Sequence, residues 1–532
     1  MFFWIRKNKL ISILVLFVII FSSYVRFKII HGSLPYIGHP DEPALTGPAL
    51  KILKTGDFNP HTFIWPSLPY YLTAALYVYG YVNSVSHREI SNTTEIGSVS
   101  YPFFSEKRLV FPAKVFFALL SVIGMLLTGM ISYNLFRKKN LIYLSPLLLL
   151  LSHSYLYHSA RYLNIDIIGT FFAVLTIFYI TKKLKNDSFL HKAIIPGILC
   201  GLAIASKYNF YLLLAPCALS IFLYSKEQRM KKFLLLIFVT LLAFIICVPY
   251  SILDFNTFLD GIGFNIYHYK SGHAGHSGTP GLPQFFYYCS ALIGQYGFGF
   301  FAFTILGILL SFISNPRKGM ILLSFPLLLL IYMSTLTVHF TRNILVIYVF
   351  VCIYCSLGIY YVLKYLHSLL KNFPLISQNK LFQKAVPALL IVAIISILLP
   401  IEDIKNAYDL KPDSRNLASY WLESNLPHDS IILVPEELDL DTRGLKEKYR
   451  IQYIDGLKVK WNFPEHLSGA YVLVPYYGYD LRDPNGKEVS SKLNISFKNV
   501  DKIIEFGNQP VLVNYHRAVP AGNPKFFIGR IQ

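Results

Sequence analysis

Long apolar runs separated by short basic connections dominate the first 400 residues. A spanning helix needs about 20 apolar residues, and runs of this kind recur along this part of the chain. They predict about eleven spans, at 10–30, 110–136, 141–159, 164–181, 193–206, 210–224, 232–250, 296–314, 320–338, 343–363 and 385–400. The runs 193–206 and 210–224 are short, which indicates a hairpin that does not fully cross the membrane.

The positive charges between these runs predict the orientation. Lys and Arg cluster in alternate connections, at 6–9, 137–139, 182–185, 226–232, 317–318 and 364–384. Cytoplasmic loops carry an excess of both residues, so we expect a cytoplasmic N-terminus and an extracytoplasmic C-terminal tail. The aromatic segment 68–85 would break this alternation as a span, and we expect it in or near the outer interface.

The pattern divides the chain into two predicted domains. Residues 1–400 form the transmembrane domain, with long outer loops at 31–109 and 251–295. The tail, 401–532, contains strand-like runs at 430–434, 471–474 and 509–513 and a helix that Asp413 or Ser414 can cap. The predicted fold class is an α-helical polytopic membrane protein with a small extracytoplasmic α/β domain.

Composition supports a multi-pass membrane protein, and the tail without cysteine favours the plasma (inner) membrane. Of 532 residues, 54% are hydrophobic, which is too many for a soluble domain. The formal net charge is +20, but the cations punctuate apolar runs and do not form the basic stripe that a nucleic-acid site needs. Nucleic acid is therefore not an expected partner. The six cysteines lie in or beside apolar runs, so no disulfide framework is indicated.

Asp41 and Glu42 are the first candidates for chemistry. They follow the first span and lie between Pro40 and Pro43, which favour a loop because proline lacks an amide donor. Ionisable groups beside a membrane are costly unless they are used or paired. We interpret this stretch as an active-site loop, although a solvated acidic pair is the simpler alternative. A helix-like run, 44–55, and an aromatic segment containing Tyr70 follow it.

Four more charged residues lie at predicted outer helix ends. Asp166 opens a span and should face the bundle, where Arg161 can neutralise it. Lys207 lies between the two short apolar runs and binds an anion or snorkels. Arg342 can hold two phosphate oxygens with its planar fork, or it anchors the interface.

The histidines near 267–278 and 339 are candidates for substrate contact. His273 and His276 lie in a glycine-rich stretch that indicates a mobile loop. Their spacing supplies two metal ligands at most, because no carboxylate or cysteine is near in sequence. His339 precedes Arg342 at the next outer helix end.

These motifs together resemble those of a known family. Asp41-Glu42, Pro66-x-Leu68-Pro69-Tyr70-Tyr71, Arg161-x4-Asp166, Gly201-x5-Lys207 and His339-x2-Arg342 occur in the same order in polyprenyl-phosphate-dependent glycosyltransferases of the GT-C fold. That group includes the protein O-mannosyltransferases (glycosyltransferase family 39) and the lipid A aminoarabinose transferases. The resemblance covers about residues 1–365, and the tail resembles the outer domains of bacterial members.

The resemblance implies a reaction and a role for each residue. The donor is a sugar on undecaprenyl or dolichyl phosphate, and the acceptor is a hydroxyl of a lipid, glycan or protein at the outer face. Asp41 would be the general base of an inverting transfer, and Glu42 would orient the acceptor. The donor phosphate would meet Arg342, Lys207 and Arg161, and the pocket would include Asp166, His339, His273, His276 and Tyr70. A divalent cation (Mg²⁺, Mn²⁺ or Zn²⁺) is an open addition, with Asp41 and Asp166 as candidate ligands.

Two other classes of protein remain as alternatives. A polytopic lipid or sugar transporter or flippase also has many spans, but it favours broken mid-membrane helices and repeated halves, and neither is evident in the sequence. A receptor or assembly subunit would use the tail as a binding module, and it has no need for carboxylate and arginine motifs in this order.

Overall fold

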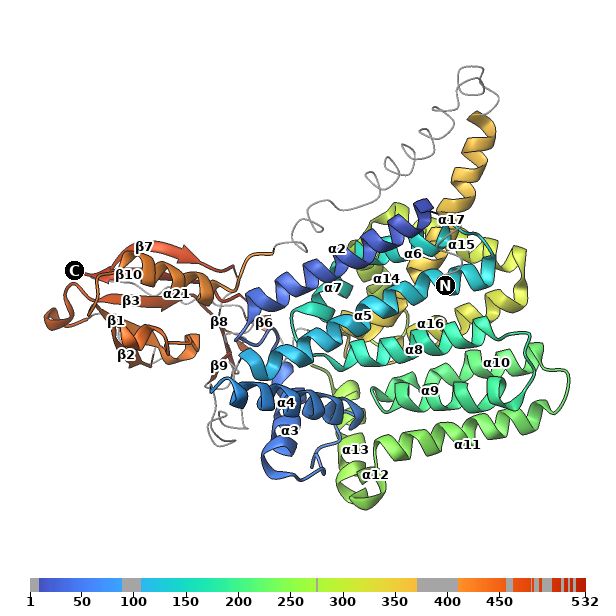
Figure 1. Ribbon diagram of the computed structural model, residues 1–532, viewed down its shortest axis with the longest axis horizontal. Coiled ribbons are helices and arrows are strands. Elements are labelled where there is room, and N and C mark those ends of the chain that lie inside the picture. The colour runs from blue at the N-terminus through green and yellow to red at the C-terminus, as the bar shows by residue number, and fades with distance from the viewer. Residues whose placement is uncertain are drawn as a thin grey trace.

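A computed structural model gives the arrangement of two parts, a bundle of helices and a tail domain at one end of it (Figure 1). The structure describes residues 9–88, 107–273, 276–370, 410–455, 463–479, 481–482, 488–489, 500–508, 511–514, 517–519 and 523–532. The expected span 385–400, the basic cluster after 370 and the boundary between the two predicted domains lie outside the described residues.

Helices make up the first part. In chain order they are α2 (Lys9–Ser33), α3 (Glu42–Thr55), α4 (Leu68–Ser86), α5 (Lys107–Phe136), α6 (Leu141–Leu150), α7 (His153–Ala160), α8 (Ile165–Lys182), η1 (Leu190–Ile194), α9 (Ile195–Ile204), η2 (Tyr208–Leu213), α10 (Leu214–Tyr224), α11 (Arg229–Cys247), α12 (Tyr250–Leu253), α13 (Phe255–Ser271), α14 (Leu282–Tyr296), α15 (Phe298–Ser314), α16 (Pro316–Ser334), η3 (Thr341–Ile344) and α17 (Leu345–Leu370).

Six helices within the described residues are long and apolar enough to cross a membrane, or seven if the pair α14 and α15, bent by 113°, counts as one span. The six are α2, α5, α8, α11, α16 and the run from Thr341 to Leu369. Three of the other expected spans correspond to shorter apolar helices at 141–150, 190–204 and 208–224. A multi-pass membrane protein is therefore confirmed, whereas the number eleven stays a prediction.

The expected outer loop 251–295 is mostly helical. α12, α13 and α14 occupy most of it, and the described residues between Ser271 and Leu282 are not helical. The expectation of a mobile loop over 267–278 is thus wrong for 267–271, because Gly272 ends α13 (φ 107°) and the glycines interrupt the helix only from that point on.

The first outer segment forms two helices. Asp41 occupies the N-cap position of α3, Pro43 lies in its first turn, and Gly56 ends it in a left-handed conformation (φ 71°). The expected helix 44–55 is thereby confirmed. α4 packs on α5, and the contact is close because a Cβ at Gly80 would lie 2.5 Å from the carbonyl oxygen of Leu109.

The tail forms an α/β domain with a core of its own. A five-stranded sheet has the order β2-β1-β3-β10-β7, in which β1 is parallel to β2 and β3, and β10 is antiparallel to β3 and β7. Smaller sheets pair β4-β8-β9 and β5-β6. The elements are α21 (Ser414–Asn425), β1 (Ile431–Pro435), η4 (Glu436–Leu438), η5 (Leu445–Glu447), β2 (Arg450–Ile454), η6 (Glu465–Leu467), β3 (Tyr471–Pro475), β4 (Tyr477–Tyr479), β5 (Leu481–Arg482), β6 (Glu488–Val489), β7 (Val500–Phe506), β8 (Val511–Asn514), β9 (Arg517–Val519) and β10 (Phe526–Ile531).

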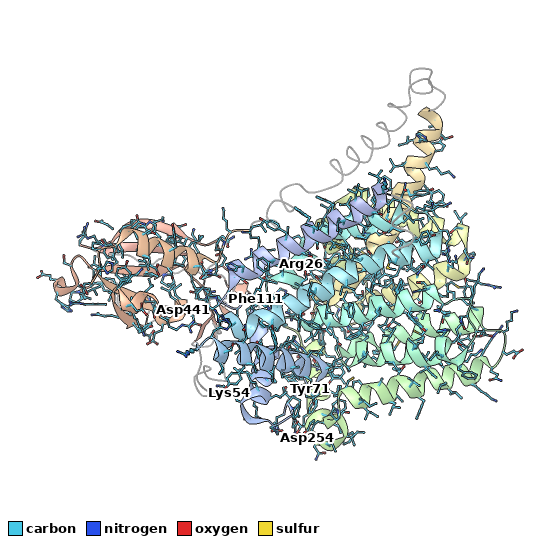
Figure 2. The ribbon with its side chains drawn as sticks, in the orientation of Figure 1. Arg26, Lys54, Tyr71, Phe111, Asp254 and Asp441 are labelled. Atoms are coloured by element: carbon cyan, nitrogen blue, oxygen red, sulfur yellow. The ribbon has the colours of Figure 1, made fainter. Side chains whose placement is uncertain are left out.

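The start of α21 joins the tail domain to the end of α2. The Asp413 amide donates to the Gly32 carbonyl at 2.9 Å, and the Asn416 amide donates to the carbonyls of Gly32 and Leu34. Asp413 also caps α21 by accepting from the Arg415 amide, as expected. Figure 2 shows the junction, with Asp441 on the side of the tail domain that faces the helices. These hydrogen bonds attach the tail domain to Gly32 and Leu34, a few residues before Asp41 and Glu42.

Candidate active site

The loop that carries Asp41 packs tightly against the turn between α7 and α8. A Cβ at Gly38 would lie 2.2 Å from the carbonyl oxygen of Arg161, so only glycine permits this approach. The Gly38 amide donates to Glu42 at 2.8 Å and closes the loop on the first turn of α3. The position of Asp41 is set by this packing.

Glu42 is buried behind the loop. Its carboxylate is 1% exposed and accepts hydrogen bonds from the backbone amides of Gly38 and Leu163, at 2.8 and 3.1 Å. Lys114 of α5, itself buried, places its Nζ 3.4 Å from the same carboxylate. These contacts leave Glu42 as the group that ties three segments together. Glu42 does not line the polar cavity beside Asp41, although the sequence predicted that it would orient the acceptor there.

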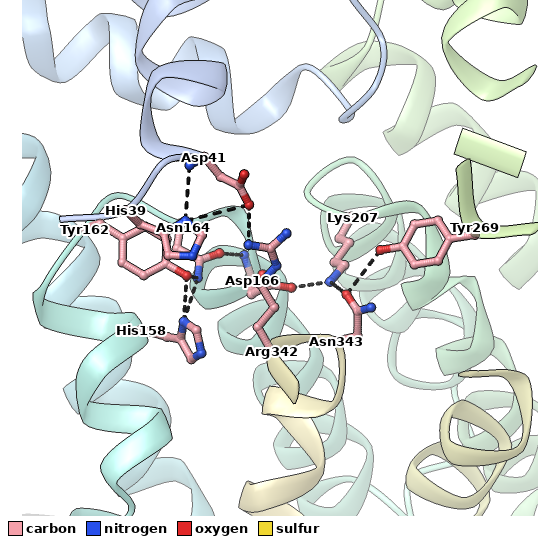
Figure 3. A network of polar contacts seen from close by, with 10 residues as sticks. All are labelled: His39, Asp41, His158, Tyr162, Asn164, Asp166, Lys207, Tyr269, Arg342 and Asn343. Atoms are coloured by element: carbon pink, nitrogen blue, oxygen red, sulfur yellow. Dashed lines mark hydrogen bonds and ion pairs between the residues drawn. The ribbon is translucent and has the colours of Figure 1, made fainter. Parts of the chain in front are cut away.

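Asp41 faces the other way and forms an ion pair with Arg342 of η3 (Figure 3). Its side chain is 37% exposed. His39 places Nδ1 3.1 Å from the Asp41 amide nitrogen and 3.7 Å from the Asp41 carboxylate. Burial acts to raise the pKa of Asp41, but Arg342 and His39 outweigh it and hold the pKa below its ordinary value. Burial lowers the pKa of His39 to about 4, so this ring is neutral at pH 7.

A second ion pair lies beside the first. Lys207 of the turn between α9 and η2 contacts Asp166 in the first turn of α8, and donates to the side-chain oxygen of Asn343 at 3.1 Å. The Tyr269 hydroxyl approaches the same Asn343 oxygen at 3.3 Å. Asp166 is buried inside the bundle, as expected. The partner that the structure gives it is Lys207, whereas the sequence suggested Arg161.

A layer of aromatic rings and one amide side chain packs against the two ion pairs. The Asn164 side chain caps α8 by accepting from the Asp166 amide at 2.8 Å, and donates to the Tyr162 hydroxyl at 3.0 Å. The Tyr162 ring stacks on His39 at a centroid distance of 4.5 Å, and its hydroxyl lies 2.6 Å from His158 Nδ1. Figure 3 shows these rings below Asp41 and beside Asp166.

Two of the expected histidines, His273 and His276, lie near Arg342, and the ring of Phe340 lies between them and its guanidinium. The guanidinium of Arg342 lies 4.5 Å from the ring centroid of Phe340, and the rings of His273 and His276 pack on Phe340 at 5.1 and 4.9 Å. His339 points elsewhere: it stacks on Tyr287 at 3.8 Å, and its Nδ1 lies 2.9 Å from Gln284.

The structure does not bring two of the expected residues into the described cluster. Tyr70 is 1% exposed and packs in the core of the bundle. Arg161 offers its backbone carbonyl to Lys114 at 3.2 Å, and its side chain does not line the cavities around Asp41. The motifs locate both residues near the site in sequence, but they do not show which way each side chain points.

Two cavities meet at the ion pairs. A polar cavity of about 40 Å³ is lined by Asp41, Trp65, Tyr162, Leu163, Asn164, Ile165, Asp166, Lys207, Tyr269, Arg342 and Asn343. A larger cavity of about 480 Å³, lined mainly by aromatic and aliphatic side chains, shares Trp65, Lys207 and Tyr269 with it. The arrangement places two cations and one accessible carboxylate at the end of an apolar groove.

The residues proposed as metal ligands do not gather into a metal site. Among the described residues, no three His, Cys, Asp or Glu side chains lie close enough together to hold an ion. Asp41 and Asp166 each pair with a cation of the protein. The binding of a divalent cation stays a prediction.

The site residues that sequence reasoning did not select include His39, Lys114, Tyr269 and Asn343. A signal existed for Lys114, because a lone lysine inside the apolar run 110–136 is costly unless it is paired. His39 and Asn343 lie within two positions of Asp41 and Arg342, which were selected. Tyr269 reaches the site through the fold, and no local sequence pattern predicts its position.

Known proteins resemble this chain in family signature and in fold. A family model described as dolichyl-phosphate-mannose-protein mannosyltransferase matches residues 107–253. The crystal structure of ArnT from Cupriavidus metallidurans bound to undecaprenyl phosphate superposes with a TM-score of 0.50 at 12% identity, over 88% of this chain and 93% of that chain. The Archaeoglobus fulgidus oligosaccharyltransferase tethered with an acceptor peptide gives 0.49 at 13% identity, over 93% of this chain and 75% of that chain. Among curated proteins, no sequence matches.

These comparisons confirm the resemblance and the fold class expected from the sequence. The family model covers part of the helical bundle, from the start of α5 to the end of α12. The likeness to ArnT extends over most of both chains and shows a common GT-C fold.

Proposed function

We propose that this chain is an integral membrane glycosyltransferase. It moves a sugar from a polyprenyl phosphate to an acceptor hydroxyl at the outer face of the membrane, with inversion at the anomeric carbon. Asp41 acts as the general base. The ArnT structure of the same fold contains undecaprenyl phosphate, which supports a lipid phosphate as the donor class.

The observation that carries this proposal is the junction of the two cavities. A polyprenyl-phosphate sugar has a long apolar chain and an anionic phosphodiester head, which gains a second negative charge when the sugar leaves it. The joined cavities offer an apolar groove that ends at two cations. Lys207 lines both cavities, and Arg342 lines the polar one. Trp65 and Tyr269 stand at the boundary, where aromatic side chains can contact both the apolar chain and the polar head.

The chemistry of such a donor needs only one carboxylate. Phosphate is a weakly basic leaving group, so it departs without a general acid, whereas glycoside hydrolysis requires two carboxyl groups. The acceptor hydroxyl still needs a base, and Asp41 is the accessible carboxylate of the polar cavity. Arg342 and Lys207 are placed to stabilise the negative charge that develops on the departing phosphate.

The Asp41–Arg342 pair would couple donor binding to base strength. While Arg342 pairs with Asp41, the pKa of this carboxyl is low and the group is a weak base. A phosphate that binds Arg342 competes with Asp41 for the guanidinium. The pKa of Asp41 then rises, and the carboxylate becomes a stronger base when the donor is present.

The charge distribution supports an outer location for the site. Asp166 lies in the first turn of α8, and Arg342 follows α16. Both line the same polar cavity, so the start of α8 and the end of α16 lie at the same end of the bundle. The other ends of these helices carry Lys182, Arg317 and Lys318. Cytoplasmic loops carry an excess of Lys and Arg, which supports an outer location for the site.

The test is turnover of purified protein in lipid nanodiscs. Labelled polyprenyl-phosphate sugars and a membrane extract supply donor and acceptor, and release of polyprenyl phosphate is measured. Asp41→Asn should lower kcat by about 10²- to 10⁴-fold, the usual contribution of a general base, while donor binding is retained. Asp57→Asn, which changes an exposed carboxylate of the same outer segment, is the control and should leave turnover unchanged.

Two results contradict the proposal in different ways. If turnover in Asp41→Asn equals that of the wild type, Asp41 is not the base, and Asp166 is the next candidate. If the lipid sugar crosses the bilayer of reconstituted vesicles without release of polyprenyl phosphate, the protein is a flippase.

A further inference from the structure

The tail domain contains a cavity of its own, distant in sequence from the candidate active site. Its volume is about 400 Å³, within the range of small-molecule sites. It is lined by Pro435, Glu436, Asp439, Leu440, Asp441, Thr442, Arg443, Lys446 and Tyr453. These residues follow the carboxyl end of β1 and include the end of the parallel neighbour β2, which is the usual place for ligands in parallel sheets.

Asp439 is the feature of this cavity that the fold alone does not explain. Its backbone is left-handed (φ 53°), a conformation that Asp adopts more readily than most residues. One carboxylate oxygen is buried and has no hydrogen-bond partner among the described residues. Burial raises the pKa of Asp439 to about 6 despite the opposing charge of Arg415. A buried, unsatisfied carboxylate beside a cavity indicates a place where a ligand completes its hydrogen bonds.

The neighbours of Asp439 indicate what kind of ligand would do so. Asp441 and Arg443 form an ion pair through two contacts of 2.8 Å. The wall of the cavity therefore offers both hydrogen-bond donors and hydrogen-bond acceptors. Tyr453 exposes 47% of its surface, and its hydroxyl lies 2.5 Å from Thr442 Oγ1. Among the described residues no three potential ligands form a metal site.

We propose that this cavity binds a pyranose sugar unit, with Asp439 accepting hydrogen bonds from its hydroxyls and Tyr453 packing on its ring. A sugar is rich in hydroxyl groups and apolar on its ring faces, which suits a wall with three carboxylates, two cations and one aromatic side chain. If the proposed transfer reaction is correct, the sugar belongs to a glycan acceptor; this last step rests on the proposed function.

The cavity is connected to the catalytic loop. The amide of Asp441 donates to the hydroxyl of Tyr36 at 3.1 Å, and the guanidinium of Arg415 lies 3.7 Å from the centroid of the Tyr36 ring. Tyr36 precedes Gly38, the residue whose amide binds Glu42. A glycan held at Asp439 is thus anchored to the segment that positions Asp41.

The experiment is saturation-transfer difference NMR on the full chain in nanodiscs. The probes are methyl α-D-mannopyranoside, methyl β-D-glucopyranoside and methyl N-acetyl-β-D-glucosaminide, with putrescine as a cationic comparison. We expect transfer to at least one glycoside for the wild type. Asp439→Asn should weaken the affinity about tenfold, because it removes a charged hydrogen-bond acceptor. Asn accepts a left-handed backbone, so the variant retains the local conformation.

Two control variants test whether glycoside binding belongs to this cavity. Asp429→Asn changes an exposed Asp with a similarly left-handed backbone (φ 63°) in the same domain, and binding should be unchanged. Asp41→Asn should also leave glycoside binding unchanged. The proposal is overturned if no glycoside shows transfer, if Asp439→Asn binds as well as the wild type, if Asp41→Asn alone abolishes binding, or if only putrescine binds.

The experiments can contradict the proposed sugar site and the proposed reaction independently of each other. Binding that depends on Asp439, together with normal turnover in Asp41→Asn, would keep the sugar site and remove the catalytic base. Loss of turnover in Asp41→Asn, together with binding indifferent to Asp439, would do the reverse.

Discussion

The two sides of the loop 36–42 place consecutive carboxylates in opposite surroundings. Glu42 is buried, accepts two backbone amides and pairs with Lys114 inside the bundle. Asp41 is 37% exposed and pairs with Arg342 at the wall of a cavity. Both are acidic residues beside a membrane, and both are neutralised. The difference lies in what surrounds the pair, since protein groups occupy the space around Glu42 whereas Asp41 borders open space.

This contrast separates a structural carboxylate from one available for chemistry. A ligand can compete with Asp41 for Arg342, because the polar cavity gives access to both side chains. No comparable space is evident at Glu42 among the described residues, and its partners lie in α5, the loop and the turn before α8. We therefore expect changes at Glu42 to act on stability and changes at Asp41 to act on turnover.

Removing the cation beside Glu42 is the strongest test of the structural side. Lys114→Met leaves a buried carboxylate without its ion-pair partner, which typically costs about 3–5 kcal/mol. The free energy of unfolding in mixed micelles should fall by that order, and the apparent Tm should fall with it. Turnover per folded molecule should change much less than in Asp41→Asn.

The double variant Glu42→Gln/Lys114→Met is the control for this loss. It removes both charges, but Gln keeps only one of the two amide hydrogen bonds, because Gly38 and Leu163 donate to different oxygens of Glu42. Part of the lost stability should return, because replacing a buried ion pair by uncharged residues of similar size is often close to neutral, whereas the amide without an acceptor still costs stability. A single variant as stable as the wild type would show that Lys114 does not support Glu42.

Asp439 of the tail domain differs from both carboxylates, because one of its buried oxygens has no hydrogen-bond partner among the described residues. Burial raises its pKa from 3.8 to about 6, so the proton is bound more tightly in the folded chain. Its contribution to stability is present below pH 4 and is lost as the pH rises through about 6. Asp439→Asn should therefore stabilise the tail by about 3 kcal/mol at pH 7.5, and the gain should shrink at pH 4.

Unfolding of the wild type and Asp439→Asn at both pH values measures this difference. Asp429→Asn provides the matched control, since Asp429 is exposed. An equal or lower stability of Asp439→Asn at pH 7.5 would mean that the Asp439 carboxylate has a partner in solution. A variant that is more stable but no longer binds sugar would fit a binding site maintained at a cost to stability.

The sequence predicted the elements of this fold well where the pattern is local. Apolar runs located the long helices, and alternating strand runs located β1, β3 and β8 of the tail. The cap at Asp413 followed from residue type. The helical character of 251–271 was missed, because Gly261 and Gly263 weaken the local pattern whereas packing against the first outer segment, where Gly261 meets Phe63, favours the helix.

The sequence motifs identified the charged residues of the candidate site, but they did not show which of these residues form ion pairs. Asp41, Asp166, Lys207 and Arg342 were each identified, and the fold brings all four together. Which cation meets which carboxylate depends on how distant segments pack. The sequence placed Arg161 beside Asp166 because the two are close along the chain, whereas the structure gives Lys207, 41 positions away, as its partner.

The smallest effect concerns the acidity of Asp41. Arg342 is the strongest charge acting on Asp41 and lowers the pKa of this carboxyl. In Arg342→Gln the pKa of Asp41 should therefore rise. The carboxylate must be ionised to act as a base, so the acidic limb of kcat/KM, which reports the free enzyme, should move to higher pH.

The comparison for this shift is Lys207→Gln, which removes the cation of the other ion pair. Both variants should lower kcat/KM, because both cations face the proposed phosphate position. Only Arg342→Gln should move the acidic limb, since Lys207 pairs with Asp166. A limb that moves equally in both variants would mean that the two ion pairs titrate as one network. A limb that moves in neither would assign the base to another group, and the contrast between Asp41 and Glu42 would lose its catalytic meaning.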